Sequence, residues 1–162
     1  MGVRNRIEQQ IGGIKMEVKV VCDRELYMPE YSNPTDACMD LRVKFEGEEA
    51  FIMPGCIETF STGLQVAVPE GHVMLIFPRS STGFKLHCAL ANGTGVIDAG
   101  YRDEVKIALY NFGAETVRLV NGQRVAQFVV LPFPKLNLVK VEDNDDFRNG
   151  DRGGGIGSTG SV

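Results

Sequence analysis

Hydrophobic and polar residues alternate along much of the chain, which is the pattern of half-buried β-strands. The stretches Met16–Val21, Glu104–Leu109 and Thr116–Val120 show this alternation. His72–Phe77 and Val125–Leu131 are more continuously apolar, so they are predicted to be strands buried on both faces. No stretch has the period of an amphipathic helix. The pattern therefore predicts an all-β fold, as a sandwich, a barrel or a jelly roll.

Turn signals separate these strands, because glycine, proline and asparagine favour tight turns. The signals are Pro54-Gly55, Pro69-Glu70-Gly71, Asn92-Gly93 and Asn121-Gly122. The chain has 162 residues and no internal repeat, so a single domain is expected.

The composition changes near both ends of the chain. Residues 1–15 are polar and glycine-marked and are predicted to be a flexible N-terminal extension, and residues 16–146 are predicted to be one β-domain. Residues 147–162 are predicted to be a glycine-rich C-terminal arm. Extended at about 3.3 Å per residue, such an arm reaches roughly 50 Å. A core of about 150 residues has a radius of gyration near 15 Å, so the arm is long enough to reach a neighbouring subunit.

Charge and cysteine usage exclude several function classes. The net charge of −4 argues against nucleic acid as a partner, and the absence of a long apolar run argues against a membrane. Cys22, Cys38, Cys56 and Cys88 form no C-x-x-C pair, so no zinc site is expected, and a reducing, cytoplasmic location is predicted. A catalytic pair of Cys88 with His87 is disfavoured, because neighbouring residues on a strand face opposite sides.

Two segments carry more polar chemistry than their structural roles require. Pro78–Lys85 gathers a guanidinium, three hydroxyls and an ammonium after a buried strand, which is the composition of an anion site. The alternative is a short helical turn capped by Ser80 or Ser81. In the hairpin Asn92–Arg102, Asp98 could activate a water molecule, or it could be an ordinary turn residue.

Polar residues also interrupt two predicted strands. Asp40 lies within the otherwise apolar Asp36–Leu41, so its carboxylate must be paired, hydrated or near a metal unless it faces solvent. Arg124 and Gln127 follow a turn and lie in a strand that is predicted to be buried, so they are candidates for a role in a site. The alternative is that they are ordinary polar residues of a turn and a strand edge.

The chain ends in the stretch DRGGGIGSTG, Asp151–Gly160. Its spacing matches G-x-G-x-x-G, but no helix can follow Gly160, so it is not a dinucleotide fingerprint. A disordered tail is the alternative. Arg152, Ser158 and Thr159 are good phosphate ligands, and the glycines expose backbone N–H donors.

Taken in order, these segments resemble the five motifs of the trimeric dUTP diphosphatases (dUTPases). The motifs correspond to Asp36–Leu41, Pro78–Lys85, Gly95–Val105, Gly122–Gln127 and Arg152–Gly160. The resemblance covers nearly all of the chain from about Val18 onward. It implies a jelly-roll-like β barrel of the β-clip type that forms a homotrimer with exchange of C-terminal arms.

The resemblance also implies an activity. The reaction would be hydrolysis of dUTP to dUMP and pyrophosphate, with Mg²⁺ held mainly by the triphosphate, limiting uracil in DNA and supplying dUMP for dTMP synthesis. Asp98 would be the catalytic residue, which deprotonates the water that attacks the α-phosphorus. Each active site would lie at a subunit interface, closed by the arm of another chain.

The resemblance assigns the substrate contacts by motif. Tyr101 would stack under the deoxyribose and exclude a 2′-hydroxyl, and Asp40 would touch the metal through water. The uracil would be read by Asn92, Gly95, Val96, Ile97 and Lys106, and covered by Ile156. The phosphates would be held by Arg79, Ser80, Ser81, Gln127, Arg152, Gly157, Ser158 and Thr159.

This sequence departs from the family pattern at three positions. Ile156 stands where the family usually has an aromatic residue on the uracil, so a stacking contribution of roughly 1–3 kcal/mol is expected to be reduced. Cys38 and Asp103 each stand where a glycine is usual.

Two other functions remain as alternatives. A dCTP deaminase, or a bifunctional enzyme of the same fold, would carry a catalytic glutamate where Ala108 stands. A non-catalytic, dUTPase-like regulatory binding module would not need Asp98, Tyr101 and the fifth motif intact.

Overall fold

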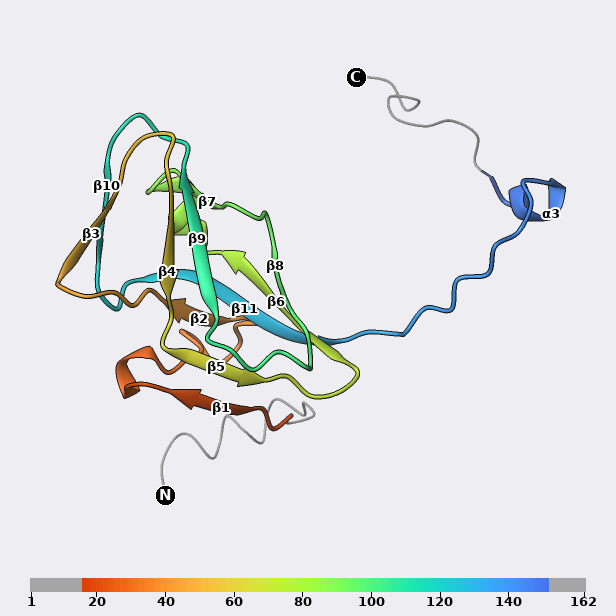
Figure 1. Ribbon diagram of the computed structural model, residues 1–162, viewed down its shortest axis with the longest axis horizontal. Coiled ribbons are helices and arrows are strands. Elements are labelled where there is room, and N and C mark those ends of the chain that lie inside the picture. The colour runs from red at the N-terminus through yellow and green to blue at the C-terminus, as the bar shows by residue number, and fades with distance from the viewer. Residues whose placement is uncertain (1–15, 152–162) are drawn as a thin grey trace.

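The computed structural model describes residues 16–151 of the chain, and the regular secondary structure among them is nearly all β-strand (Figure 1). The predicted N-terminal extension, residues 1–15, and residues 152–162 of the predicted arm lie outside the described residues. No helix in the described part of the chain is long and apolar enough to cross a membrane.

The described chain forms a succession of short strands with three brief helical turns. The strands are β1 (Lys19–Cys22), β2 (Met39–Arg42), β3 (Glu49–Ile52), β4 (Ile57–Ser61), β5 (Leu64–Ala67), β6 (His72–Pro78), β7 (Cys88–Leu90), β8 (Gly95–Ile97), β9 (Lys106–Asn111), β10 (Val117–Val120) and β11 (Arg124–Pro132). The helical turns are η1 (Glu25–Tyr27), α2 (Ser80–Phe84) and α3 (Asp145–Arg148).

The strands form small antiparallel sheets that surround one core. Their orders are β2-β11-β6-β8, β4-β9-β7, β1-β5 and β10-β3. Strands far apart in sequence lie side by side, as in β1 with β5 and β3 with β10. The predicted all-β fold is confirmed, and this arrangement belongs to its barrel-like class (Figure 1).

The predicted strands are present, but β1, β9 and β10 begin later than their alternation suggests, β10 by a single residue. β1 begins at Lys19 because its partner, β5, offers only the residues from Leu64 to Ala67. β9 begins at Lys106 because the Val105 N–H bonds instead to the Leu64 carbonyl, at 2.8 Å. Local alternation predicts that a strand exists, whereas the partner strand determines its ends.

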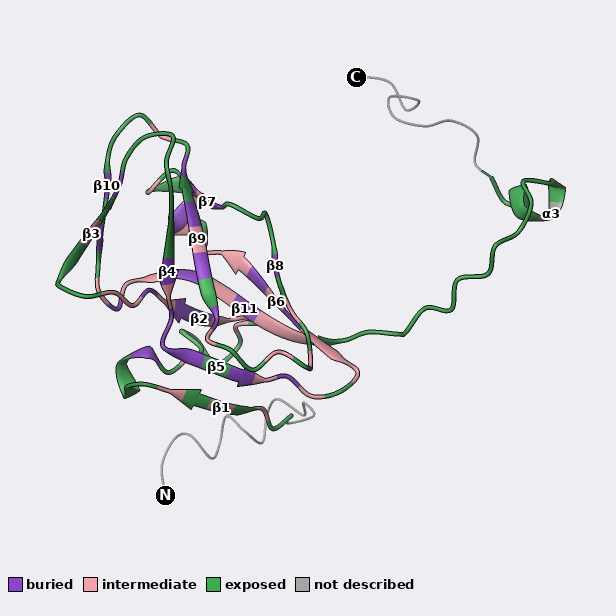
Figure 2. Cartoon of the chain, in the orientation of Figure 1, coloured by how far each residue is buried: buried purple, intermediate pink, exposed green. Residues whose placement is uncertain are grey.

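The core lies between the sheets and is made of buried side chains from most of the strands (Figure 2). The side chains with the least exposure include Leu41, Ile52, Met74, Ile107 and Leu109. In β6, Met74 and Ile76 are buried, whereas the alternating Val73, Leu75 and Phe77 are only half-buried. The prediction that His72–Phe77 is buried on both faces is therefore wrong for the single chain, because only one face of β6 packs on this core.

After β11 the chain leaves the body and runs out to α3 (Figure 1). Leu136, Leu138 and Val139 on this segment are each more than 70% exposed. α3 begins after Asn144, whose side-chain oxygen accepts a hydrogen bond from the Phe147 N–H at 3.1 Å. The domain boundary predicted at residue 146 stays a prediction.

Candidate active site

The sheet topology brings the first, second and fourth motifs together. Gln127 on β11 lies between Asp40 on β2 and Phe77 on β6 in the strand register. Arg79 follows β6 by one residue, so it emerges beside Asp40. Residues that are 39 to 87 positions apart in the sequence thus meet because β11 pairs with both β2 and β6.

Asp40 is the centre of this cluster, with only 7% of its surface exposed. One carboxylate oxygen accepts from the Arg79 Nε at 2.7 Å, and the other lies 3.1 Å from the Arg124 Nη1. The Ser32 hydroxyl donates to that second oxygen at 2.8 Å. The carboxylate is therefore paired, as one of the sequence interpretations required, and it holds two guanidinium groups on one side of the sheet.

Arg124 and Ser32 complete this cluster in addition to the residues proposed from the sequence. Arg124 Nη1 also donates to the Ser32 hydroxyl at 2.9 Å. The motif resemblance pointed to the segment that contains Arg124. No sequence signal points to Ser32, because it lies in a loop and reaches Asp40 only through the fold.

The segment after β6 forms the short helix α2, which confirms the helical-turn interpretation of Pro78–Lys85. The cap residue is Arg79, with no side-chain hydrogen bond, so the expected capping by Ser80 or Ser81 is wrong. Ser80 is exposed and Ser81 half-buried, which leaves both hydroxyls free of a capping role. The Thr82 hydroxyl instead anchors the helix to β11 by donating to the Val125 carbonyl at 2.6 Å.

Gln127 is anchored to the same segment. Its amide nitrogen donates to the Pro78 carbonyl at 3.1 Å, which ties β11 to the residue directly before Arg79. Because this bond holds the amide nitrogen, it also fixes the orientation of the side-chain oxygen of Gln127.

The cysteines show no sign of nucleophilic chemistry. Burial, followed by the nearby Asp36 and Asp40 carboxylates, raises the pKa of the Cys38 thiol, so the protonated form is favoured at neutral pH. Cys88 is buried at the start of β7, whereas His87 precedes the strand with a positive φ of 51° and is exposed, so the two are not neighbours on a strand as was expected. All four cysteines are free.

The third motif forms a second part of the candidate site, around a cavity of about 340 Å³. The cavity lies between β8 on one side and β7 and β9 on the other, and its lining residues are Thr59, Ile76, Leu90, Ala91, Asn92, Gly95, Lys106, Ile107 and Ala108. This volume is at the lower end of the range for small-molecule sites, about 300–1,000 Å³. Asn92, Gly95 and Lys106, all proposed from the sequence, therefore do share one cavity.

β8 is suited to reading a flat polar ligand. It is the edge strand of its four-stranded sheet within the described residues, so one side of its backbone is not used in the ladder. Gly95 lets β8 lie close against β6, because a Cβ there would be only 3.0 Å from the Ile76 Cβ. Free backbone N–H and C=O groups are therefore available beside the cavity.

Asp98 and Tyr101 lie just beyond β8. The Tyr101 N–H donates to the Asp98 carbonyl at 3.0 Å, forming a tight turn, and the Asp98 side chain is exposed. The Tyr101 hydroxyl donates to the Glu104 carbonyl at 3.0 Å, which orients the ring. Asp98 is thus both a turn residue and a free carboxylate, so the two interpretations of the sequence do not exclude each other.

Within one chain, the phosphate-type cluster and Asp98 lie apart. Ile97 pairs with Met74, so Asp98 lies near Val73, at the start of β6, whereas Arg79 follows its end. At about 3.3 Å per residue, the stretch of β6 between them spans about 20 Å. The structure therefore brings the first, second and fourth motifs together in one place. The parts of the third motif lie together in another place. The proposed ligands Arg152, Ile156, Gly157, Ser158 and Thr159 lie outside the described residues.

The dUTPase family model matches residues 24–160, which is most of the chain. The chain belongs to the dUTPase family. Among curated dUTPases, it is 41% identical over 139 residues to the deoxyuridine 5′-triphosphate nucleotidohydrolase of Escherichia phage T5, covering 83% of this chain and 92% of the relative. It is 36% identical over 149 residues to the enzyme of that name from Ehrlichia canis, covering 91% and 95%.

Solved dUTPase structures share the fold. A dUTPase of Staphylococcus phage 80alpha superposes with a TM-score of 0.73 at 25% identity, covering 88% of this chain and 99% of that one. The dUTPase of S. aureus phage phi11, whose structure reveals the coordination of a structural Mg(II) ion, superposes with a TM-score of 0.69 at 26% identity, covering 79% and 98%.

The acidic residues described here do not form a metal site by themselves. Among residues 16–151, no group of three or more histidine, cysteine, aspartate or glutamate side chains could hold a metal ion. Asp40 is taken up by two arginines and a hydroxyl. A Mg²⁺ ion fits this dUTPase only if the substrate supplies most of its ligands, as the hard oxygens of phosphates do.

Proposed function

We propose that this member of the dUTPase family hydrolyses dUTP to dUMP and pyrophosphate, limiting uracil in DNA and supplying dUMP for dTMP synthesis. The observation that carries the proposal is that the chain has both a cavity, lined by Asn92 and the free edge of β8, and an arginine cluster around Asp40. The first suits a planar base and the second suits phosphate oxygens. The relatives named above carry the same activity in their names.

Asp98 is the proposed catalytic residue. Its exposed carboxylate can accept a proton from a water molecule and direct that water at the α-phosphorus, which releases pyrophosphate as the leaving group. Phosphoryl transfer depends mainly on positioning and charge stabilisation, so a well-placed carboxylate is sufficient as a base.

The remaining contacts follow from the two parts of the site. The backbone of Gly95, Val96 and Ile97, with Asn92 and Lys106, reads the uracil, and Tyr101 packs under the deoxyribose. The residues that hold the phosphates are Arg79, Ser80, Ser81 and Gln127, joined by Arg152, Gly157, Ser158 and Thr159 from the arm, with Ile156 over the base. Mg²⁺, when bound, would neutralise part of the triphosphate charge, and Asp40 would contact that ion through water.

We further propose that the active sites are shared within a homotrimer. The separation of about 20 Å along β6 is too long for Asp98 and Arg79 of one chain to act on adjacent phosphorus atoms. A site assembled from two chains removes this difficulty. The half-buried Val73, Leu75 and Phe77 on the outer face of β6 are candidates for the subunit contact. The exposed segment after β11 runs away from the body of its own chain (Figure 1).

Mixing two inactive variants tests the shared site. Asp98→Asn disables the part of the site that activates water, and Arg79→Ala disables the part that binds phosphate. Mixed trimers, formed by refolding the two variants together, therefore contain some sites in which both residues are intact. Random assembly of equal amounts is expected to restore roughly a quarter of the parent activity. The matched control is each variant refolded alone. If the mixture stays as inactive as its components, each site is built within one chain.

The cavity argues against a deaminase. Ala108 lies in its lining, at the position where a dCTP deaminase of the same fold would carry a catalytic glutamate. The lining residues, all within the described part of the chain, include no carboxylate that could serve as the acid and base of deamination. We also place the protein in the cytoplasm, on the basis of its free cysteines, with neither nucleic acid nor membrane as a partner.

A nucleotide panel tests the proposed activity. The protein is incubated with dUTP, dCTP, dTTP or UTP and Mg²⁺, and the release of pyrophosphate and ammonia is followed. Pyrophosphate from dUTP alone is expected, because the cavity is built to read one base and one sugar. Ammonia release from dCTP would instead establish a deaminase, and no release from any nucleotide would establish a binding module.

A further inference from the structure

Glu104 joins the end of the third motif to a turn that belongs to no motif. One carboxylate oxygen accepts from the Gly63 N–H at 2.6 Å, and the other accepts from the Ser61 hydroxyl at 3.1 Å. Ser61 and Gly63 form the turn between β4 and β5. The side chain of Glu104 is 27% exposed, so it lies at the edge of the core and not within it.

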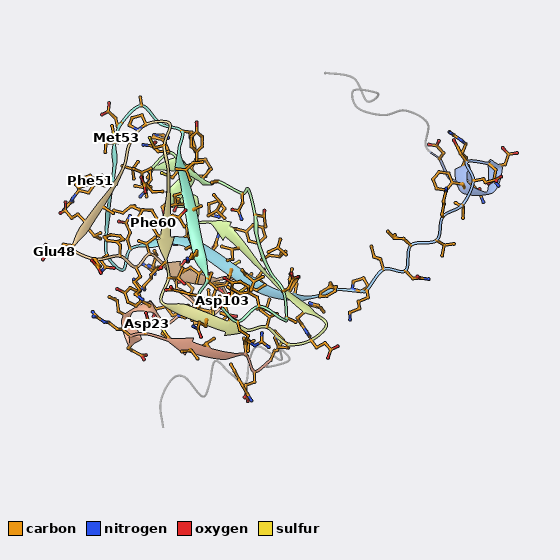
Figure 3. All side chains as sticks on the ribbon, in the orientation of Figure 1. Asp23, Glu48, Phe51, Met53, Phe60 and Asp103 are labelled. Atoms are coloured by element: carbon orange, nitrogen blue, oxygen red, sulfur yellow. The ribbon has the colours of Figure 1, made fainter. Side chains whose placement is uncertain are left out.

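The main chain of the same residue orients Tyr101. The Tyr101 hydroxyl donates to the Glu104 carbonyl at 3.0 Å. The Glu104 carboxylate is therefore hydrogen-bonded to the β4–β5 turn, and the Glu104 carbonyl is hydrogen-bonded to the Tyr101 hydroxyl. Glu104 thus connects this turn to the ring of Tyr101. Asp103, one of the two residues between Tyr101 and Glu104, is labelled in Figure 3.

The turn that Glu104 contacts is also held by other segments of the chain. Gly63 has a positive φ of 69°, and a Cβ at this position would lie 3.1 Å from the Tyr27 ring. The Gly63 carbonyl accepts from the Asp23 N–H at 2.9 Å, so both backbone polar groups of Gly63 are hydrogen-bonded. Lys44, which pairs with Asp23 (labelled in Figure 3), also lies 3.7 Å from the Glu104 carboxylate.

The hydrogen bonds of the Glu104 side chain are not needed to attach the start of β9 to the β4–β5 turn. The next residue, Val105, donates to the Leu64 carbonyl at 2.8 Å and accepts from the Thr62 hydroxyl at 2.7 Å. These bonds hold β9 to the β4–β5 turn without any contribution from the Glu104 side chain. The carboxylate therefore adds positional precision to a connection that already exists.

We propose that Glu104 is a positioning residue for sugar selection, which fixes the Tyr101 ring through the Ser61–Gly63 turn. The inference rests on the proposed function, because it takes Tyr101 to be the residue under the deoxyribose. A ring held from the β4–β5 turn leaves no room for a 2′-hydroxyl. A ring released by loss of the carboxylate can shift and admit the ribonucleotide.

The test compares kcat and KM for dUTP and UTP in the parent, Glu104→Ala, Glu104→Gln and Tyr101→Phe. Glu104→Ala is expected to lower the ratio of kcat/KM for dUTP to that for UTP roughly tenfold, since small displacements of positioning groups have effects of this size. Most of the change is expected in KM, with kcat for dUTP altered less than about twofold. The amide oxygen of Glu104→Gln can accept from the Gly63 N–H and its nitrogen can donate to the Ser61 hydroxyl, so this variant should retain the parent ratio.

Two further variants separate positioning from general damage. Combining Glu104→Ala with Tyr101→Phe should lower the ratio no more than the larger single effect, because both changes break one chain of bonds. Glu49→Ala removes a carboxylate that pairs with Arg118 on the distant β3–β10 ribbon, and it should leave the ratio unchanged. The melting temperature of each variant is recorded beside its kinetics.

The outcomes are distinguishable. A parent chain that releases no pyrophosphate from dUTP would overturn the proposed function and this inference together. A parent that prefers dUTP, with Glu104→Ala keeping the same preference, would overturn the role of Glu104 alone. A lower kcat and melting temperature at an unchanged dUTP preference would make Glu104 a purely structural residue, which also overturns the inference.

Discussion

Replacing Asp98 by asparagine is expected to lower kcat for dUTP by roughly a thousandfold, because general-base catalysis contributes about 10²- to 10⁴-fold. The amide keeps the size of the carboxylate but cannot take a proton from water. Asp98 is exposed at the end of β8, and the turn bond to Tyr101 uses its main-chain carbonyl. The substitution should therefore leave the hairpin intact.

The measurement pairs steady-state kinetics with calorimetric binding of a non-hydrolysable dUTP analogue. Binding is expected to stay within a few-fold of the parent, since Asp98 acts on the water and not on the base. Asp103→Asn is the matched control, because it removes another exposed carboxylate from the same loop. Turnover of Asp98→Asn at the parent rate would show that another group activates the water.

Removal of residues 152–162 is expected to lower kcat/KM for dUTP by about a hundredfold or more. The proposal assigns Arg152, Ser158 and Thr159 to the phosphates, and preorganised donors to developing charge contribute about 10²–10³ each. The packed strands end with β11 at Pro132, so the truncated chain should fold and melt like the parent. Kinetics and thermal unfolding, measured together, separate the two effects.

A shorter truncation provides the control for this experiment. Deleting only Ser161 and Val162 leaves the whole fifth motif in place, so the parent activity is expected. If the long truncation is also fully active, residues 152–162 are a tail without a function in catalysis. If it loses its melting transition, the segment instead stabilises the fold.

The all-β class and most of the strands could be predicted from the sequence. Alternating side chains have a period of two, which local composition reveals without knowledge of the partner strand. The turn at Asn121-Gly122 was predicted in the same way, and Gly122 has the positive φ, 83°, that such turns favour. The order of the five motifs then indicated the family, which the family model and the curated relatives confirm.

The ends of the strands and the capping of α2 could not be predicted in this way. β9 begins only after Val105 has bonded to the β4–β5 turn, which is a contact between distant segments. The serines of the second motif do not cap their helix, because Arg79 occupies the cap position with extended backbone and Thr82 provides the anchor to β11. Such choices depend on neighbours that are remote in sequence.

The amino-acid sequence by itself determined the all-β class, the turns, the family and the residue types that carry the chemistry, because these depend on local order along the chain. Only the tertiary structure decided that Asp40 holds Arg79 and Arg124, that Ser32 joins them, and that Glu104 links Tyr101 to the β4–β5 turn. It also decided that Asp98 and Arg79 lie at opposite ends of β6. The physical reason is that strand pairing brings together residues of any sequence separation, and no local pattern records which strands will pair.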